Sequence, residues 1–153
     1  TARSSTIAKQ PGGDITPTED EEVNLLGDHI QITSAIYNLL DNAIKYTEEG
    51  TGKIDITIQA KENNIEVMIS DNGIGIPESS HNRVFERFYR VDPSRSRESG
   101  GTGLGLAIVR HVVLNHDGKI SLDSKEGQGT SFTISLPQQK QDQIETNPTE
   151  VKV

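Results

Sequence analysis

Two kinds of hydrophobic spacing divide the first half of this chain. Between residues 28 and 47 the apolar side chains recur at helical spacing, and Asp28 is placed to cap the N-terminus of the predicted helix. Aliphatic residues then alternate with polar ones over 54–58 and again over 65–69, which predicts two half-buried strands with a tight hairpin turn at Asn63-Asn64. We therefore expect a helix followed by an antiparallel pair of strands.

The second half of the chain repeats this change of spacing. We expect a short helix over 83–89, a second amphipathic helix over 104–115, and strands over 120–122 and 132–136 that are joined by a turn at 126–129. Hairpins mixed with helices predict an α+β fold in which helices cover one face of a sheet.

Ordered structure is expected mainly in the central part of the chain. Residues 1–22 are polar, with at most one edge strand, and residues 138–153 are rich in Gln, Asp and Glu with almost no apolar side chains, which predicts a disordered tail. The length of 153 residues is enough for one domain with a hydrophobic core, which we place at residues 23–137.

The composition excludes several classes of function. A net charge of −8 and a pI of about 4.9 argue against nucleic acid or an anionic membrane surface as the main partner. The sequence has no apolar run of the roughly 18 residues that span a bilayer. The chain has no cysteine, which excludes thiol chemistry, and its 4 histidines lack the spacing of metal ligands. No nucleophile is paired with a base to suggest a hydrolase.

One face of the first predicted helix carries polar side chains in a row. At about 100° per residue, Asn38, Asn42 and Lys45 fall on a narrow stripe, and the apolar residues fall on roughly the opposite side. Amide oxygens are suitable ligands for Mg²⁺, and an ammonium group suits a phosphate. The alternative is that this stripe is the ordinary wet face of an amphipathic helix.

A glycine-rich segment begins where the second predicted strand ends. Asp71 is followed by Asn72-Gly73-Ile74-Gly75. A carboxylate at a strand end can accept a hydrogen bond from an exocyclic amine, and the two glycines permit positive φ and the close approach of a ligand. The same residues are also ordinary turn chemistry, so a plain turn is the alternative.

A second glycine-rich segment, Gly101 to Gly105, runs directly into a predicted helix, whose N-terminal N–H groups would favour phosphate. It is not a dinucleotide-binding fingerprint, because Leu106 stands where a third glycine is needed, and the chain has no Gly-Lys-Ser/Thr phosphate loop. A flexible surface loop is the alternative. Gly127 and Gly129, followed by Thr130, either shape a base pocket or form a simple hairpin turn.

A basic stretch lies between the two glycine-rich segments. Residues 83–97 carry five arginines against two carboxylates, a surplus of three positive charges in an acidic chain. Such a segment can close over a triphosphate as a lid, or it can pair with the acidic N-terminal stretch. Phe85, Phe88 and Tyr89 are interpreted as anchors of this lid rather than as base-stacking groups. The arginines are Arg83, Arg87, Arg90, Arg95 and Arg97.

Taken together and in this order, five segments resemble the ATP-binding catalytic domain of bacterial sensor histidine kinases, a family grouped with DNA gyrase B, the ninety-kilodalton heat-shock chaperone and MutL. The matches to the family's N box, first G box, F box, second G box and short final G box are residues 38–47, 71–77, 85–90, 101–107 and 127–130. The resemblance covers about residues 20–137. It implies a two-layer α/β sandwich of Bergerat type, with a mixed sheet of about five strands under about three helices.

The resemblance implies a set of roles for these residues. Asn42 would be the main Mg²⁺ ligand with Asn38 assisting, and Lys45 would touch the phosphates. Tyr46 would lie against the adenine or ribose, and Asp71 would read the adenine N6 amine. The other implied nucleotide contacts are Thr130, acting through water beside Asp71, together with Gly73, Gly75, Ile76, Gly101, Thr102, Gly103, Leu104, Gly105 and Leu106.

The resemblance also implies an activity, which is transfer of the γ-phosphate of MgATP to a histidine on a separate dimerisation domain of the same parent kinase, with a response regulator acting downstream. The histidine-bearing hairpin is not in this chain. We therefore expect an excised catalytic domain from the cytoplasmic part of a membrane-bound sensor, without direct membrane contact. Hydrolysing relatives have a glutamate where this chain has Asn38, and an amide cannot take a proton from water. A serine kinase of the anti-sigma type and a non-catalytic ATP-dependent interaction module remain as alternatives.

Overall fold

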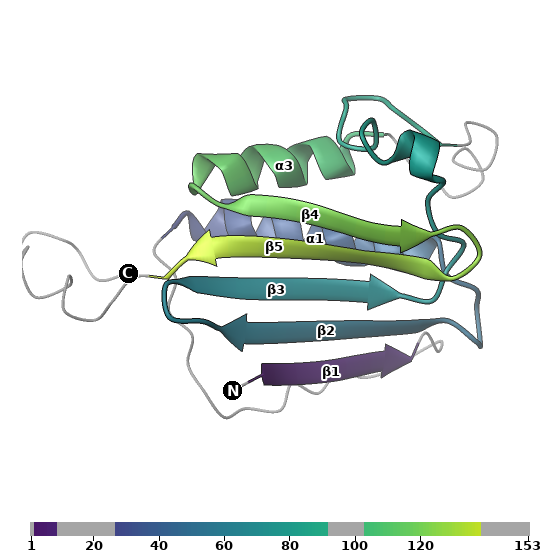
Figure 1. Ribbon diagram of the computed structural model, residues 1–153, viewed down its shortest axis with the longest axis horizontal. Helices are drawn as coiled ribbons and strands as arrows, with labels where there is room; N and C mark the ends of the chain where they lie inside the picture. Colours follow the sequence, from purple (N-terminus) through teal and green to yellow (C-terminus); the bar gives the residue numbers. More distant parts are fainter. Residues whose placement is uncertain (1, 9–26, 92–102, 139–153) are drawn as a thin grey trace, which may run out of the picture.

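The computed structural model describes residues 2–8, 27–91 and 103–138. Over these residues the chain forms a five-stranded sheet and two α-helices (Figure 1). Most of the expected N-terminal polar segment and nearly all of the expected tail lie outside the described residues. The elements are β1 Ala2–Ala8, α1 His29–Lys45, β2 Lys53–Ala60, β3 Asn64–Asp71, a 3₁₀ helix Glu78–Ser80, α3 Gly105–Asn115, β4 Lys119–Lys125 and β5 Gly129–Pro137.

The helix α1 begins where its capping residue predicts. The Asp28 carboxylate accepts hydrogen bonds from the N–H groups of Ile30 and Gln31 at 3.0 and 3.2 Å, and these are donors that have no partner inside the helix. The buried face of α1 consists of Ala35, Leu39 and Ala43. The polar stripe that the sequence indicated borders this buried face, and its members Asn38 and Asn42 are half-buried.

The sheet has the strand order β1-β2-β3-β5-β4, with every neighbouring pair antiparallel. The expectation of a mixed sheet was therefore wrong. β2–β3 and β4–β5 are hairpins, and β5 returns against β3, so no two neighbours share a direction. The first hairpin turn is centred on Glu62-Asn63, one residue earlier than expected, because the Lys61 N–H donates to the Asn64 carbonyl at 2.7 Å and closes the turn there.

Both α-helices pack on the sheet through one hydrophobic core. Figure 1 shows α1 behind the sheet, and it shows α3 running along the sheet above β4. Apolar residues from both helices and from strands β2, β3 and β5 meet in this core, and together they fix the distance between α1 and the strand ends. These residues are Ala35, Leu39, Ala43, Ile54, Ile69, Val109, Val112, Val113, Phe132, Ile134 and Leu136.

The short helix expected over 83–89 is not found, and the segment forms a run of turns after the 3₁₀ helix. Phe88 has a φ of 65°, which a helix does not accommodate, and its N–H donates to the Gly103 carbonyl at 2.8 Å. The chain therefore turns toward the start of α3. Phe85 anchors the segment, because its ring meets Phe132 edge-on with the ring centres 6.1 Å apart.

Candidate functional site

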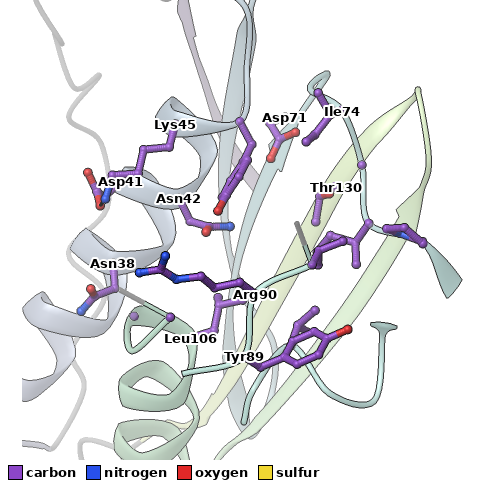
Figure 2. Close-up of a pocket in the computed structure, with 18 of the residues that line it drawn as sticks. Asn38, Asp41, Asn42, Lys45, Asp71, Ile74, Tyr89, Arg90, Leu106 and Thr130 are labelled. Atoms are coloured by element: carbon purple, nitrogen blue, oxygen red, sulfur yellow. Dashed lines mark ion pairs between the residues drawn. The ribbon is translucent and has the colours of Figure 1, made fainter. Parts of the chain in front are cut away.

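A cavity of about 290 Å³ opens between α1, the loop after β3, the start of α3 and the β4–β5 turn (Figure 2). It brings together segments that lie far apart in the sequence. Its lining residues are Asn38, Asp41, Asn42, Lys45, Tyr46, Asp71, Ile74, Gly75, Ile76, Pro77, Val84, Tyr89, Arg90, Val91, Gly103, Gly105, Leu106, Glu126 and Thr130. Most of the predicted site residues are in this set.

The two asparagines of α1 present their amides at one end of the cavity. The Asn38 side-chain nitrogen donates to the Ser34 carbonyl at 2.8 Å, which leaves its Oδ1 for other partners. That oxygen faces the start of α3, since a Cβ built on Gly105 would lie 3.2 Å from it. Asn42 is half-buried, points into the cavity, and has no side-chain hydrogen bond within the described part of the chain (Figure 2). An amide oxygen in this setting can take a cation or a bound ligand.

Lys45 is paired with a residue that the sequence pattern did not single out. Its Nζ lies 2.8 Å from a carboxylate oxygen of Asp41, one helical turn earlier, and both side chains are about one-third exposed, at 31% and 37%. The spacing of four residues could have indicated this pair, because such residues share a helix face. A phosphate that enters here competes with Asp41 for the lysine.

Arg90 is the second cation that lines the cavity. The arginine-rich segment was expected to contribute a lid, and this residue extends across the cavity toward Asn38 and Asn42 (Figure 2). Against Lys45 and Arg90, the lining contains three carboxylates, those of Asp41, Asp71 and Glu126. The described lining alone therefore does not neutralise a triphosphate, and a divalent cation would make up part of the difference.

The start of α3 faces the same end of the cavity. Leu104 occupies the N-cap position and provides no side-chain cap, unlike Asp28 on α1. Gly105 and Leu106 line the cavity, whereas Leu104 does not. A helix N-terminus without a side-chain cap offers N–H groups and a positive dipole end to an anion. The predicted contacts Gly101 and Thr102 lie outside the described residues.

Gly103 has a conformation and a contact that only glycine accepts. Its φ is 73°, and a Cβ would lie 2.8 Å from the carbonyl carbon of Phe88. This contact joins the turn segment to the start of α3, as does the Phe88–Gly103 hydrogen bond. The lining residues Arg90 and Gly105 are thereby held at one end of the cavity.

At the other end of the cavity, Asp71 is the last residue of β3. Its carboxylate accepts from the Gly73 N–H at 2.9 Å and from the Thr130 N–H of the neighbouring strand. Burial raises the pKa of Asp71 above its ordinary value, and these two N–H groups oppose that change. The carboxyl is therefore oriented by the backbone and partly removed from water, as a specific ligand contact requires.

The glycines after Asp71 serve the protein's own packing. Gly73 does not have positive φ and does not line the cavity, in contrast to the expectation. A Cβ there would collide with the Tyr46 carbonyl, which also accepts from the Ile74 N–H at 3.1 Å. Gly75 does have positive φ, 71°, and lines the cavity, and its backbone also approaches the Lys125 carbonyl, with which a Cβ would collide in the same way. These contacts join α1 and the β4–β5 turn to the loop that follows β3, residues 72–77, which we call the Asp71 loop.

The site does not have the donor set of a metal centre formed by protein alone. Across residues 27–91 and 103–138, no group of His, Cys, Asp and Glu side chains is arranged to hold a metal by itself. The donors present are amide and carboxylate oxygens, which fit Mg²⁺ bound mainly through phosphates and water. Within the same described residues, no helix is long and apolar enough to cross a bilayer.

Comparison with known proteins gives consistent matches. Residues 27–140 match the family described as histidine kinase-, DNA gyrase B-, and HSP90-like ATPase. The sensor-like histidine kinase SenX3 of Mycolicibacterium smegmatis is 48% identical over 124 residues, which is 81% of this chain and 32% of that protein. The sensor histidine kinase WalK of Bacillus subtilis is 43% identical over 120 residues, 77% of this chain and 20% of that protein. The chain spans a third or less of these relatives.

Solved structures show the same similarity. The mycobacterial sensor histidine kinase MprB superimposes with a TM-score of 0.64 at 36% identity, covering 74% of this chain and 76% of that one. The catalytic domain of the histidine kinase ThkA gives a TM-score of 0.62 at 33% identity, covering 72% of this chain and 69% of that one. Full-length ShkA in complex with AMPPNP gives 0.60 at 28% identity, covering 71% and 21%.

Proposed function

This chain belongs to the histidine kinase-, DNA gyrase B-, and HSP90-like ATPase family and is the ATP-binding catalytic domain of a histidine kinase, and we propose that it binds MgATP and transfers the γ-phosphate to a histidine on a separate domain of its parent. The observation that supports this most is the convergence of Asn42, Asp71 and the start of α3 on one cavity. These groups suit a metal, a base amine and a phosphate respectively.

The orientation of the nucleotide follows from this distribution. The adenine lies at the Asp71 and Thr130 end, where the carboxylate accepts from its amine and Tyr46 covers the base or ribose. The phosphates extend toward Asn38, Asn42 and the start of α3. Two separate ends with different chemistry therefore define a single direction for the nucleotide.

The phosphate end works by positioning and by neutralising charge. Asn42 would hold Mg²⁺ with Asn38 assisting, and the bound ion would polarise the phosphoryl oxygens. Arg90 and Lys45 compensate the negative charge that remains, with Lys45 exchanging Asp41 for a phosphate oxygen. Asn38 cannot act as a base toward water, so the γ-phosphate is kept for transfer.

Phosphotransfer supplied in trans tests the proposal. The chain with labelled MgATP should incorporate no stable label by itself, and it should label the parent's histidine-bearing hairpin when that domain is added. The linkage should be labile in acid, as a phosphohistidine is. Stable phosphoserine on a partner would support the anti-sigma alternative instead. Binding of ATP with no transfer to any hairpin or partner would support a non-catalytic module.

The Asp71 carboxyl predicts a pH dependence of binding. Because its pKa is raised, ATP affinity should fall as the pH is lowered through an acid range that lies above the range in which an ordinary aspartate is protonated. The effect of this group on folding stability has the opposite pH dependence. A pKa that is raised in the folded chain stabilises that chain at low pH, and this stabilisation is lost as the pH rises. Calorimetry across this range, corrected for protonation of free nucleotide, measures the effect. An affinity that follows nucleotide protonation alone would contradict it.

A further inference from the structure

We propose that Ser124 is a positioning residue that makes the Thr130 hydroxyl a hydrogen-bond acceptor toward the cavity, and thereby favours a 6-amino purine over a 6-oxo purine. The inference rests on the proposed function, because it concerns the base end of the same nucleotide site. Ser124 itself does not line the cavity, so any effect it has on a ligand acts through its neighbours.

The Ser124 Oγ makes three polar contacts. It lies 2.7 Å from the Ile76 nitrogen, 2.9 Å from the Gly129 carbonyl oxygen and 2.8 Å from the Thr130 Oγ1. The amide N–H can only donate and the carbonyl can only accept. A serine hydroxyl has one hydrogen and two lone pairs.

Only one assignment satisfies all three contacts as hydrogen bonds. Ser124 gives its hydrogen to the Gly129 carbonyl and accepts from the Ile76 N–H with one lone pair. The remaining lone pair faces Thr130, so the Thr130 hydroxyl must donate to Ser124. The hydrogen of Thr130 is thereby occupied, and its Oγ1 has only lone pairs left for other partners.

This polarity matters because of where Thr130 lies. It is only 6% exposed, it lines the cavity, and it is the cross-strand partner of Asp71. The ionised Asp71 is also an acceptor, so these two neighbouring side chains present acceptors and no donor. An exocyclic amine supplies the hydrogens that they require, whereas a 6-oxo group brings a third acceptor.

A water between Thr130 and the base would transmit the same preference. Such a water gives one hydrogen to Thr130 and has its second for a ring nitrogen. The N1 atom of adenine accepts that hydrogen, and the N1–H of hypoxanthine does not. Direct and water-mediated contact therefore favour the same base.

Ser124 also has a structural role, which an experiment must separate from this one. Its bond to the Ile76 N–H joins the Asp71 loop to β4, and a second bond from the Gly127 N–H to the Ile74 carbonyl, 2.7 Å long, joins the same loop to the β4–β5 turn. The second bond does not involve the Ser124 side chain, so the loop keeps one connection in Ser124→Ala.

The test compares the affinities of the whole chain for MgATP and for Mg-inosine triphosphate by calorimetry. The parent should prefer ATP. Ser124→Ala frees the Thr130 hydroxyl to rotate and donate to a 6-oxo group, so the ratio of ATP to inosine triphosphate affinity should fall about tenfold. Thr130→Val, of similar shape, should also lower the ratio. In a Thr130→Val background, Ser124→Ala should leave the ratio unchanged, because Ser124 acts through the hydroxyl.

The opposite results are equally distinct. If Ser124→Ala weakens both nucleotides by the same factor, its role is structural only and the inference is overturned. If Ser124→Ala does not fold, Thr130→Val alone decides, and an unchanged ratio in that variant overturns the inference. If the parent binds ATP and the affinity ratio is unaltered in the variants, the inference is overturned and the proposed function stands. If the parent binds neither nucleotide, the inference and the proposed function are both overturned.

Discussion

Asp71→Asn should weaken MgATP binding by about a hundredfold. The substitution replaces a charged acceptor with an amide, and its NH₂ group must then face either the adenine amine or the Thr130 N–H, donor against donor. A lost charge-assisted hydrogen bond together with an unsatisfied buried group accounts for a factor of this order. Calorimetric titration of both chains with MgATP measures it.

Folding should survive this change, which makes the result specific to binding. Burial raises the Asp71 pKa, so at neutral pH its ionised carboxylate is a cost to the folded chain, and a neutral amide removes that cost, which offsets the loss of one backbone hydrogen bond. The matched control is Asp123→Asn, the same chemical change on an exposed residue of β4 outside the cavity lining. Parent-like ATP affinity in Asp71→Asn, or an equal loss in the control, would contradict the assigned base contact.

Asn42→Ala should lower the rate of transfer to the added hairpin domain by at least about a hundredfold. The substitution removes the proposed protein ligand for Mg²⁺ while leaving α1 intact, since alanine favours a helix more than asparagine does. The loss should be partly recovered at high Mg²⁺ concentration, because mass action offsets a weakened metal site. Initial rates of phosphotransfer across a Mg²⁺ titration measure both effects.

The control for this substitution is Asn115→Ala, at the exposed end of α3 and outside the cavity lining. It makes the same change of side chain and should transfer phosphate at the parent's rate. A rate in Asn42→Ala that is low but independent of Mg²⁺ concentration would show that Asn42 acts on something other than the metal.

Much of this architecture could be predicted from the sequence because it depends on local patterns. Apolar spacing located both α-helices, and Asp28 located the start of α1. The family inferred from five short segments is confirmed by the match over residues 27–140. Each of these features is encoded within a few neighbouring residues.

Features that depend on contacts between distant segments could not be predicted in this way. The helix expected over 83–89 does not form, because Phe88 has positive φ and its N–H donates to the Gly103 carbonyl. Gly73 is needed beside the Tyr46 carbonyl rather than beside a ligand. The roles of Arg90 and Ser124 depend equally on which segments the fold brings together. No spacing rule within one segment contains this information.

The most direct test of the central claim is a crystal structure of this chain with Mg²⁺ and a non-hydrolysable ATP analogue. We predict the adenine amine within hydrogen-bonding distance of the Asp71 carboxylate, and a magnesium ion that joins the Asn42 amide oxygen to the phosphates. A nucleotide bound outside this cavity, or bound with its phosphates at Asp71 and its base at Asn42, would contradict the proposed site.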